Sequence, residues 1–133
     1  MKYVILIHSN PEPWGHPTSI YTKEGRELPQ EQHDEMDREF EAVMREITAS
    51  GEFVTAEALA DPASATLYHW ASEGHLATDG PYAESKEHLA GFFLIDCDSR
   101  ARADEIAAKF AQPGGSSSYG PRCGPAATIS DGC

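Results

Sequence analysis

A histidine that extends the apolar face of a helix is the first residue here whose type and position fit proton transfer. His33 lies three residues before Met36 and seven before Phe40, at the N-terminal end of that face. A histidine in this position can border a cavity and act as a general acid or base, because it titrates near neutral pH. The alternative interpretation is a half-exposed histidine that only begins the helix.

His8 and Asp79 are the other two candidates for proton transfer. His8 ends an apolar run on the side of Val4 and Leu6, from which it can reach the same cavity or form a solvated strand end. Asp79 precedes Gly-Pro, where an aspartate commonly bonds its own backbone to hold a turn, and this structural role competes with a catalytic one. We therefore expect any catalytic site to use His33, Asp79 and His8.

Other residues fit the binding of a small organic ligand. Trp14 lies in a stretch rich in Pro and Gly, residues 9–29, which we expect to be a long loop that covers a pocket. Lys86 can hold an anionic group or pair with a carboxylate such as Glu84; the alternative is a solvated ion-pair network worth under about 1 kcal/mol per pair. The expected ligand-binding residues are Trp14, Tyr82, Glu84 and Lys86.

The spacing that metals and cofactors require is missing. The histidines His69, His75 and His88 are scattered, and no H-x-x-x-H pair is present. The sequence also has no G-x-S-x-G, phosphate-binding glycine loop or dinucleotide fingerprint. We therefore expect no metal and no cofactor. The cysteines are odd in number, lack C-x-x-C spacing and are expected to be free thiols: Cys97, Cys123 and Cys133.

Hydrophobic patterns predict the elements that must position these residues. Residues 3–8 and 91–96 are continuous apolar runs, typical of strands buried on both faces. From Gln30 to Ser50 apolar residues recur at helical spacing, and Gly51 ends this helix. The remaining predictions are a strand over 53–59, a hairpin of 66–70 and 75–78, and a helix that Ser99 caps and residues 113–115 end.

This order of elements predicts the α+β class, with the ferredoxin-like split β-α-β antiparallel sheet in a single domain. Two helices cover one face of such a sheet and leave the other face bare. Because two strands are predicted to be buried on both faces, we expect a second subunit to cover the bare face and form a homodimer.

Charge limits the partners of the chain. Its 22 acidic and 10 basic residues give a formal net charge of −12, which repels nucleic acid and anionic membranes and suits a basic regulatory protein as partner. No apolar stretch approaches the roughly 20 residues of a membrane helix, and the N-terminus does not fit a signal peptide. We therefore expect a cytoplasmic protein that binds neither nucleic acid nor membrane.

The turn and strand around Asp79 also carry a family resemblance. Residues Thr78 to Glu87, followed by Gly91-Phe92-Phe93-Leu94-Ile95-Asp96, resemble the DGPF branch of the YCII-related family. Tyr82 stands where that branch usually has Phe, which keeps the ring and adds a hydroxyl. The likeness runs from residue 1 to about residue 112. It implies a dimeric α+β barrel of two ferredoxin-like subunits and little about activity, because most members have no assigned function.

The last residues depart from that resemblance. Family members end with a strand of the type V-E-x-R-P, whereas residues 116–125 have no strand period and contain two prolines. A change of reading frame at Gly115 permits VVELRPAVWPGGDDL, which is similar to the missing strand. We therefore expect a YCII-related domain over residues 1–112 and an atypical tail over 113–133, either frameshifted or naturally disordered.

Two functions follow from these observations. The first is a small-molecule-binding or regulatory accessory dimer, with its ligand in a cleft between the sheet, the first helix and the loop of residues 9–29. The second is a lyase-like enzyme in which His33 or His8 works with Asp79 on a small organic substrate, as the resemblance to a dehydrochlorinating relative implies. We favour the first, because no nucleophile, metal set or cofactor motif accompanies the histidines.

Overall fold

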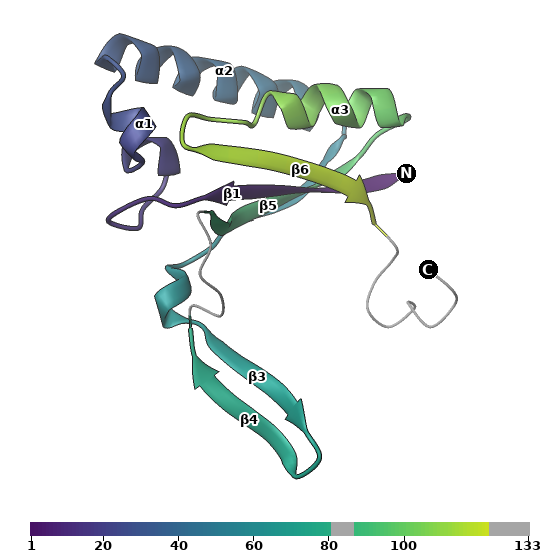
Figure 1. Ribbon diagram of the computed structural model, residues 1–133. Coiled ribbons are helices and arrows are strands. Elements are labelled where there is room, and N and C mark those ends of the chain that lie inside the picture. Colours follow the sequence, from purple (N-terminus) through teal and green to yellow (C-terminus); the bar gives the residue numbers. More distant parts are fainter. Residues whose placement is uncertain (81–86, 123–133) are drawn as a thin grey trace.

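The computed structural model describes residues 1–80 and 87–122 (Figure 1). Within them the chain forms six strands, three α-helices and two short 3-10 helices, η1 (Thr18–Ile20) and η2 (Pro62–Ser64). The strands are β1 (Lys2–Ser9), β2 (Phe53–Ala58), β3 (Thr66–Ala71), β4 (Gly74–Asp79), β5 (His88–Asp96) and β6 (Gly115–Pro121). The helices are α1 (Lys23–Arg26), α2 (Gln30–Ala49) and α3 (Arg100–Ala108). No helix in this described part is long and apolar enough to cross a membrane.

Four strands form an antiparallel sheet in the order β2-β5-β1-β6, and β3 and β4 form a separate two-stranded sheet. Both long helices, α2 and α3, lie over one face of the larger sheet (Figure 1). With β3 and β4 inserted as a hairpin between β2 and β5, this is the split β-α-β arrangement. The predicted ferredoxin-like α+β fold is confirmed.

The core lies between the helices and this sheet. In β1, Tyr3 and Ile5 are 5% and 0% exposed and face the helices, whereas Val4 and Leu6 alternate with them and are only half-buried. We call the side without helices the open face. Its apolar residues in the two central strands are Val4, Leu6, Phe92 and Leu94. The buried core residues are Tyr3, Ile5, Val43, Ile47, Ile95, Cys97, Ala103, Ile106, Ala107 and Phe110.

Local signals explain where the long helices begin and end. Ser50 closes α2 and Gly51 follows with a φ of 81°, the left-handed conformation that glycine adopts without strain. At the start of α3 the Ser99 hydroxyl oxygen accepts a hydrogen bond from the backbone N–H of Arg102 at 3.1 Å. Both boundaries agree with the sequence-based prediction.

The expectation of no strand after residue 113 is wrong, because β6 pairs along its length with β1. Main-chain hydrogen bonds to β1 form this edge strand, and they do not depend on an alternating side-chain pattern. Tyr119 packs edge-to-face on Tyr3 with ring centroids 6.3 Å apart, and the Ser117 hydroxyl donates to the Ala107 carbonyl at 2.8 Å. Pro121 lies at the end of β6, where it does not interrupt the pairing.

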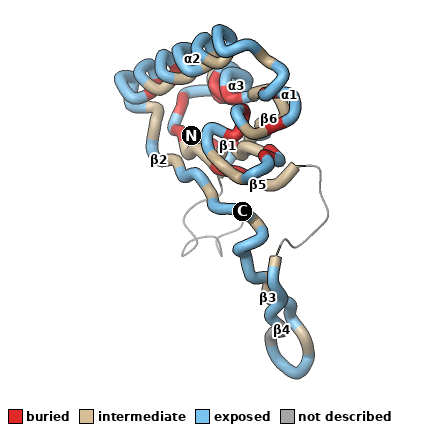
Figure 2. The backbone as a smooth tube through the Cα atoms, turned by 90° about the vertical axis from the view of Figure 1, so that its left-hand side faces the viewer, coloured by how far each residue is buried: buried red, intermediate tan, exposed pale blue. Residues whose placement is uncertain are grey.

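Outside the larger sheet, the structure changes the prediction for one segment and agrees with it for another. The stretch expected as an irregular loop contains η1 and α1, and the Thr22 hydroxyl caps α1 by accepting from Gly25 N–H at 3.1 Å. The predicted hairpin is present and projects from the body on the side away from α2 and α3 (Figures 1 and 2). Its described residues are exposed or half-buried.

Candidate functional site

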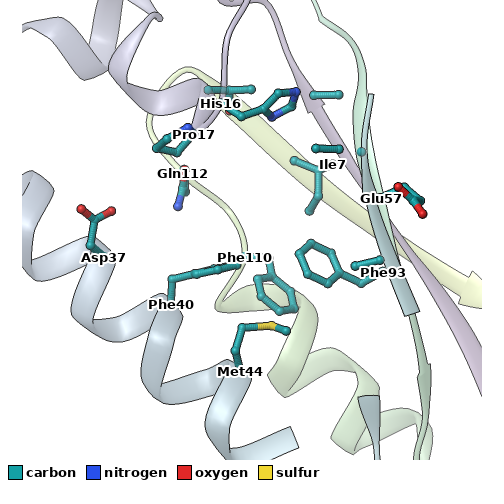
Figure 3. A pocket seen from close by; sticks show the side chains of 15 residues that line it. Ile7, His16, Pro17, Asp37, Phe40, Met44, Glu57, Phe93, Phe110 and Gln112 are labelled. Carbon is teal, nitrogen blue, oxygen red and sulfur yellow. The ribbon is translucent and has the colours of Figure 1, made fainter. Parts of the chain in front are cut away.

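A cavity of about 440 Å³ lies between α2, the helix-covered face of the sheet and the loop from β1 to α2 (Figure 3). The sequence predicted a cleft in this place, between the sheet, the first long helix and the loop of residues 9–29. The lining residues are Ile7, His16, Pro17, Thr18, Asp37, Phe40, Met44, Ala56, Glu57, Ala58, Ala90, Gly91, Phe93, Phe110 and Gln112.

Three phenylalanine rings form one wall of the cavity. Phe93 and Phe110 stack with ring centroids 4.3 Å apart and planes 9° apart. Phe40 meets both rings edge-on, at 6.3 Å from Phe93 and 5.7 Å from Phe110. Phe93 comes from β5, Phe40 from α2 and Phe110 from the turn after α3, so packing of these elements fixes the shape of the wall.

Helix α2 supplies a second wall with one carboxylate. Asp37, Phe40 and Met44 are spaced by three and four residues, so they lie on one face of the helix. In Figure 3 Phe40 and Met44 point from α2 toward the cavity, and the exposed Asp37 lies at its edge. Asp37 was not among the predicted site residues, although its position one turn before Phe40 would have placed it there.

The loop from β1 to α2 supplies another wall, and the Leu59 carbonyl group anchors two of its side chains. The Trp14 indole N–H donates to the Leu59 carbonyl oxygen at 2.9 Å, and the His16 Nε2 lies 2.9 Å from the same oxygen. Since a carbonyl only accepts, the His16 Nε2 bears the proton in this contact. The Trp14 and His16 rings pack edge-to-face at 6.2 Å. Trp14 therefore holds the loop in place, while His16 lines the cavity.

The predicted catalytic residues lie in three separate places. The His33 Nε2 bonds the Gly25 carbonyl at 2.7 Å and joins α2 to α1. The His8 Nε2 lies 3.3 Å from the Ser118 hydroxyl, on the open face between β1 and β6. Asp79 is exposed at the end of β4 in the projecting hairpin. None of the three lines the cavity.

The remaining expected residues divide between the described part of the chain and the rest. Trp14 is described and supports the loop. Tyr82, Glu84 and Lys86 lie outside the described residues. Across residues 1–80 and 87–122, no group of three or more His, Cys, Asp or Glu side chains is placed to hold a metal ion.

The cavity is therefore apolar, with few polar groups around it. The lining residues with polar side chains are His16, Thr18, Asp37 and Gln112, and the Glu57 carboxylate points away from the cavity in Figure 3. Ligand pockets commonly combine a mostly apolar lining with a few polar groups that orient the ligand. This arrangement suits binding of a small apolar molecule that has one or two polar substituents.

Comparison with known proteins supports the resemblance to the YCII-related family. The family model described as the YCII-related domain matches residues 1–118, from β1 into β6. An uncharacterised protein of Rhizobium meliloti (strain 1021) is 36% identical over 108 residues, which are 80% of this chain and 77% of that protein.

Proposed function

Because this chain belongs to the YCII-related domain family, we propose that it is a small-molecule-binding dimer whose ligand occupies the cavity beside α2. The observation that carries this proposal is the cavity of about 440 Å³ with its wall of three phenylalanines. Its volume falls in the range of roughly 300–1,000 Å³ that small-molecule pockets usually have. The position of the cavity also matches the cleft expected from the sequence.

The chemistry of the wall narrows the class of ligand. Flat rings pack well on aromatic faces and edges, so a compound with one or two fused rings suits Phe40, Phe93 and Phe110. Asp37 can accept a hydrogen bond from a hydroxyl or amino substituent. The same carboxylate and the net charge of −12 oppose an anionic ligand. We therefore expect a neutral ring compound that carries a hydrogen-bond donor.

The open face of the sheet supports a homodimer. Val4 and Leu6 in β1 pair with Leu94 and Phe92 in β5, so four apolar side chains meet on a surface without helices. Covering such a surface with its copy removes apolar area from water on both subunits. The family resemblance implies the same arrangement, a dimeric α+β barrel.

The lyase-like alternative receives no support from the placement of its residues. His33 contacts the Gly25 carbonyl and His8 contacts the Ser118 hydroxyl. A general base must lie within hydrogen-bond reach of the proton it abstracts in a bound substrate. Because Asp79 lies in the projecting hairpin, these residues do not converge on the cavity.

A ligand screen with matched probes and variants tests the binding proposal. Calorimetry compares naphthol with naphthoate on the parent and on Asp37→Asn and Asp79→Asn. We expect naphthol to bind the parent more tightly than naphthoate. Asp37→Asn should weaken naphthol binding by about tenfold, because it exchanges a charged acceptor for a neutral one, a difference of about 1.4 kcal/mol. Asp79→Asn should bind like the parent. Loss of binding in Asp79→Asn with normal binding in Asp37→Asn would place the ligand elsewhere.

A further inference from the structure

The β3–β4 hairpin projects from the four-stranded sheet and its helices and forms a separate sheet (Figure 1). Its two strands pair with each other and not with the four-stranded sheet. Figures 1 and 2, turned by 90° relative to each other, both place it on the side away from α2 and α3. A two-stranded hairpin without a hydrophobic face to pack on is marginally stable in water.

Two large aromatic residues lie on one face of this hairpin. Tyr68 and Trp70 are two positions apart in β3, so their side chains leave the strand on the same face. Tyr68 is 67% and Trp70 is 81% exposed, more than any other aromatic residue in the part of the chain that the structure describes. Exposed aromatic residues of this kind are enriched at protein interfaces, where Trp and Tyr often dominate binding.

The direction of the hairpin points to what covers these aromatics. It projects on the same side as the open face, which carries the half-buried Val4, Leu6, Phe92 and Leu94. Leu89, 40% exposed, pairs with His8 near the start of β5 and extends this apolar surface toward the hairpin. One chain thus presents an apolar sheet face and an aromatic arm on one side.

We propose that the β3–β4 hairpin is a dimerisation arm whose Tyr68 and Trp70 pack on a second copy of this chain. In a two-fold pair that buries the open face, each arm extends past its own sheet and meets the partner. By symmetry, the arm of each copy packs on the other copy, so the open face and the arm are covered in both subunits. This inference rests on the proposed homodimer and adds the surface that stabilises it.

The test compares dimer dissociation in the parent and in the double variant Tyr68→Ser/Trp70→Ser. Sedimentation velocity from about 0.1 to 100 µM measures the dissociation constant, with far-UV circular dichroism to check that each variant folds. The matched control is His69→Ser, an exposed change in the same strand on its other face. We expect the double variant to dissociate at least about tenfold more readily, and the control to stay within about twofold of the parent.

Fluorescence gives a second readout that does not depend on weakening the dimer. The chain has two tryptophans, so Trp14→Phe leaves Trp70 as the sole tryptophan, which can be excited without exciting the five tyrosines. Its emission should move to longer wavelength on dilution below the dissociation constant. A parent that stays monomeric at 100 µM overturns both the dimer and the arm. A dimer whose dissociation constant is the same in the double variant, or whose Trp70 emission does not change on dilution, overturns the arm alone.

Discussion

Replacing Glu52 by Gln is expected to destabilise the fold by about 2 kcal/mol. The two carboxylate oxygens of Glu52 accept from Arg102 Nη2 and Nε, both at 2.9 Å, so the helix α3 is tied to the start of β2 by a bidentate pair. Only 14% of the Glu52 side chain and 24% of the Arg102 side chain are exposed. Hydrogen bonding from Arg102 lowers the pKa of Glu52 from 4.5 to about 2, although burial acts in the opposite direction.

The magnitude follows from this change in pKa. A fall from 4.5 to about 2 corresponds to at most about 3.4 kcal/mol, and the remaining solvent contact of the pair reduces the value to about 2 kcal/mol. The pKa of Glu52 is lower in the folded than in the unfolded state. Its contribution to stability is therefore complete above about pH 4.5 and is lost as the pH falls from about 4.5 to about 2.

Urea unfolding, followed by circular dichroism at one fixed protein concentration, measures this contribution at pH 7 and pH 3. The control is Glu105→Gln, because Glu105 contacts the same Arg102 at 3.1 Å but is 63% exposed, and its loss should cost under about 1 kcal/mol. The difference between the parent and Glu52→Gln should fall by more than half at pH 3. Equal losses for the two variants at pH 7, or a difference that does not change with pH, would refute the reasoning.

Three further predictions concern the core, the sheet and the thiols. Phe110→Ala should lower the unfolding free energy by about 3–5 kcal/mol in urea, because it removes a buried stacked ring; a loss under about 1 kcal/mol would contradict the packing. Gly91→Ala should cost about 1–3 kcal/mol, since its Cβ would lie 2.6 Å from the Glu57 carbonyl oxygen, whereas Gly120→Ala, with no described atom within 4 Å, should stay near the parent. Cys97 is buried, and burial raises the pKa of its thiol, so it should react with a thiol reagent more slowly than the other two cysteines; three equal rates would contradict this.

The elements with strong hydrophobic patterns could be predicted from the sequence. Helix α2 was evident because its apolar residues recur at helical spacing from Met36 to Ile47, about three turns, and Gly51 follows the helix. Strand β5 was evident because residues 91–95 form a continuous apolar run. In both elements the local pattern and the final packing agree, so tertiary contacts did not alter the prediction.

Strand β6 could not be predicted from its own residues because the contacts that make it a strand come from β1. Three serines and two glycines give residues 115–121 no hydrophobic pattern. The segment becomes a strand because β1 offers a row of main-chain donors and acceptors along its edge. The Arg100 guanidinium, 5.2 Å from the centre of the Tyr119 ring, adds a contact between distant parts of the chain that sequence spacing does not reveal.

The position of the cleft was predictable, and the helical spacing to Phe40 could have indicated Asp37, whereas His16 could not have been found. The topology alone places a long loop beside α2 and the sheet. His16 lies in a Pro-rich segment without periodicity, and only its contact with the Leu59 carbonyl shows how it reaches the cavity wall. His33 has the expected helical position, but α1 lies against that end of α2 and supplies the Gly25 carbonyl to it.

The way in which β6 is held has a consequence for sequence change in this family. Its main chain pairs with β1 along its length, and side-chain contacts to the rest of the fold are added by Ser116, Ser117, Ser118 and Tyr119. Because the pairing with β1 uses main-chain groups, substitution of these side chains removes their own contacts but leaves the hydrogen bonds between the two strands. Even replacement of every side chain after Gly115, as a change of reading frame produces, leaves the main-chain groups that β1 requires, except the N–H donor at any position that becomes proline.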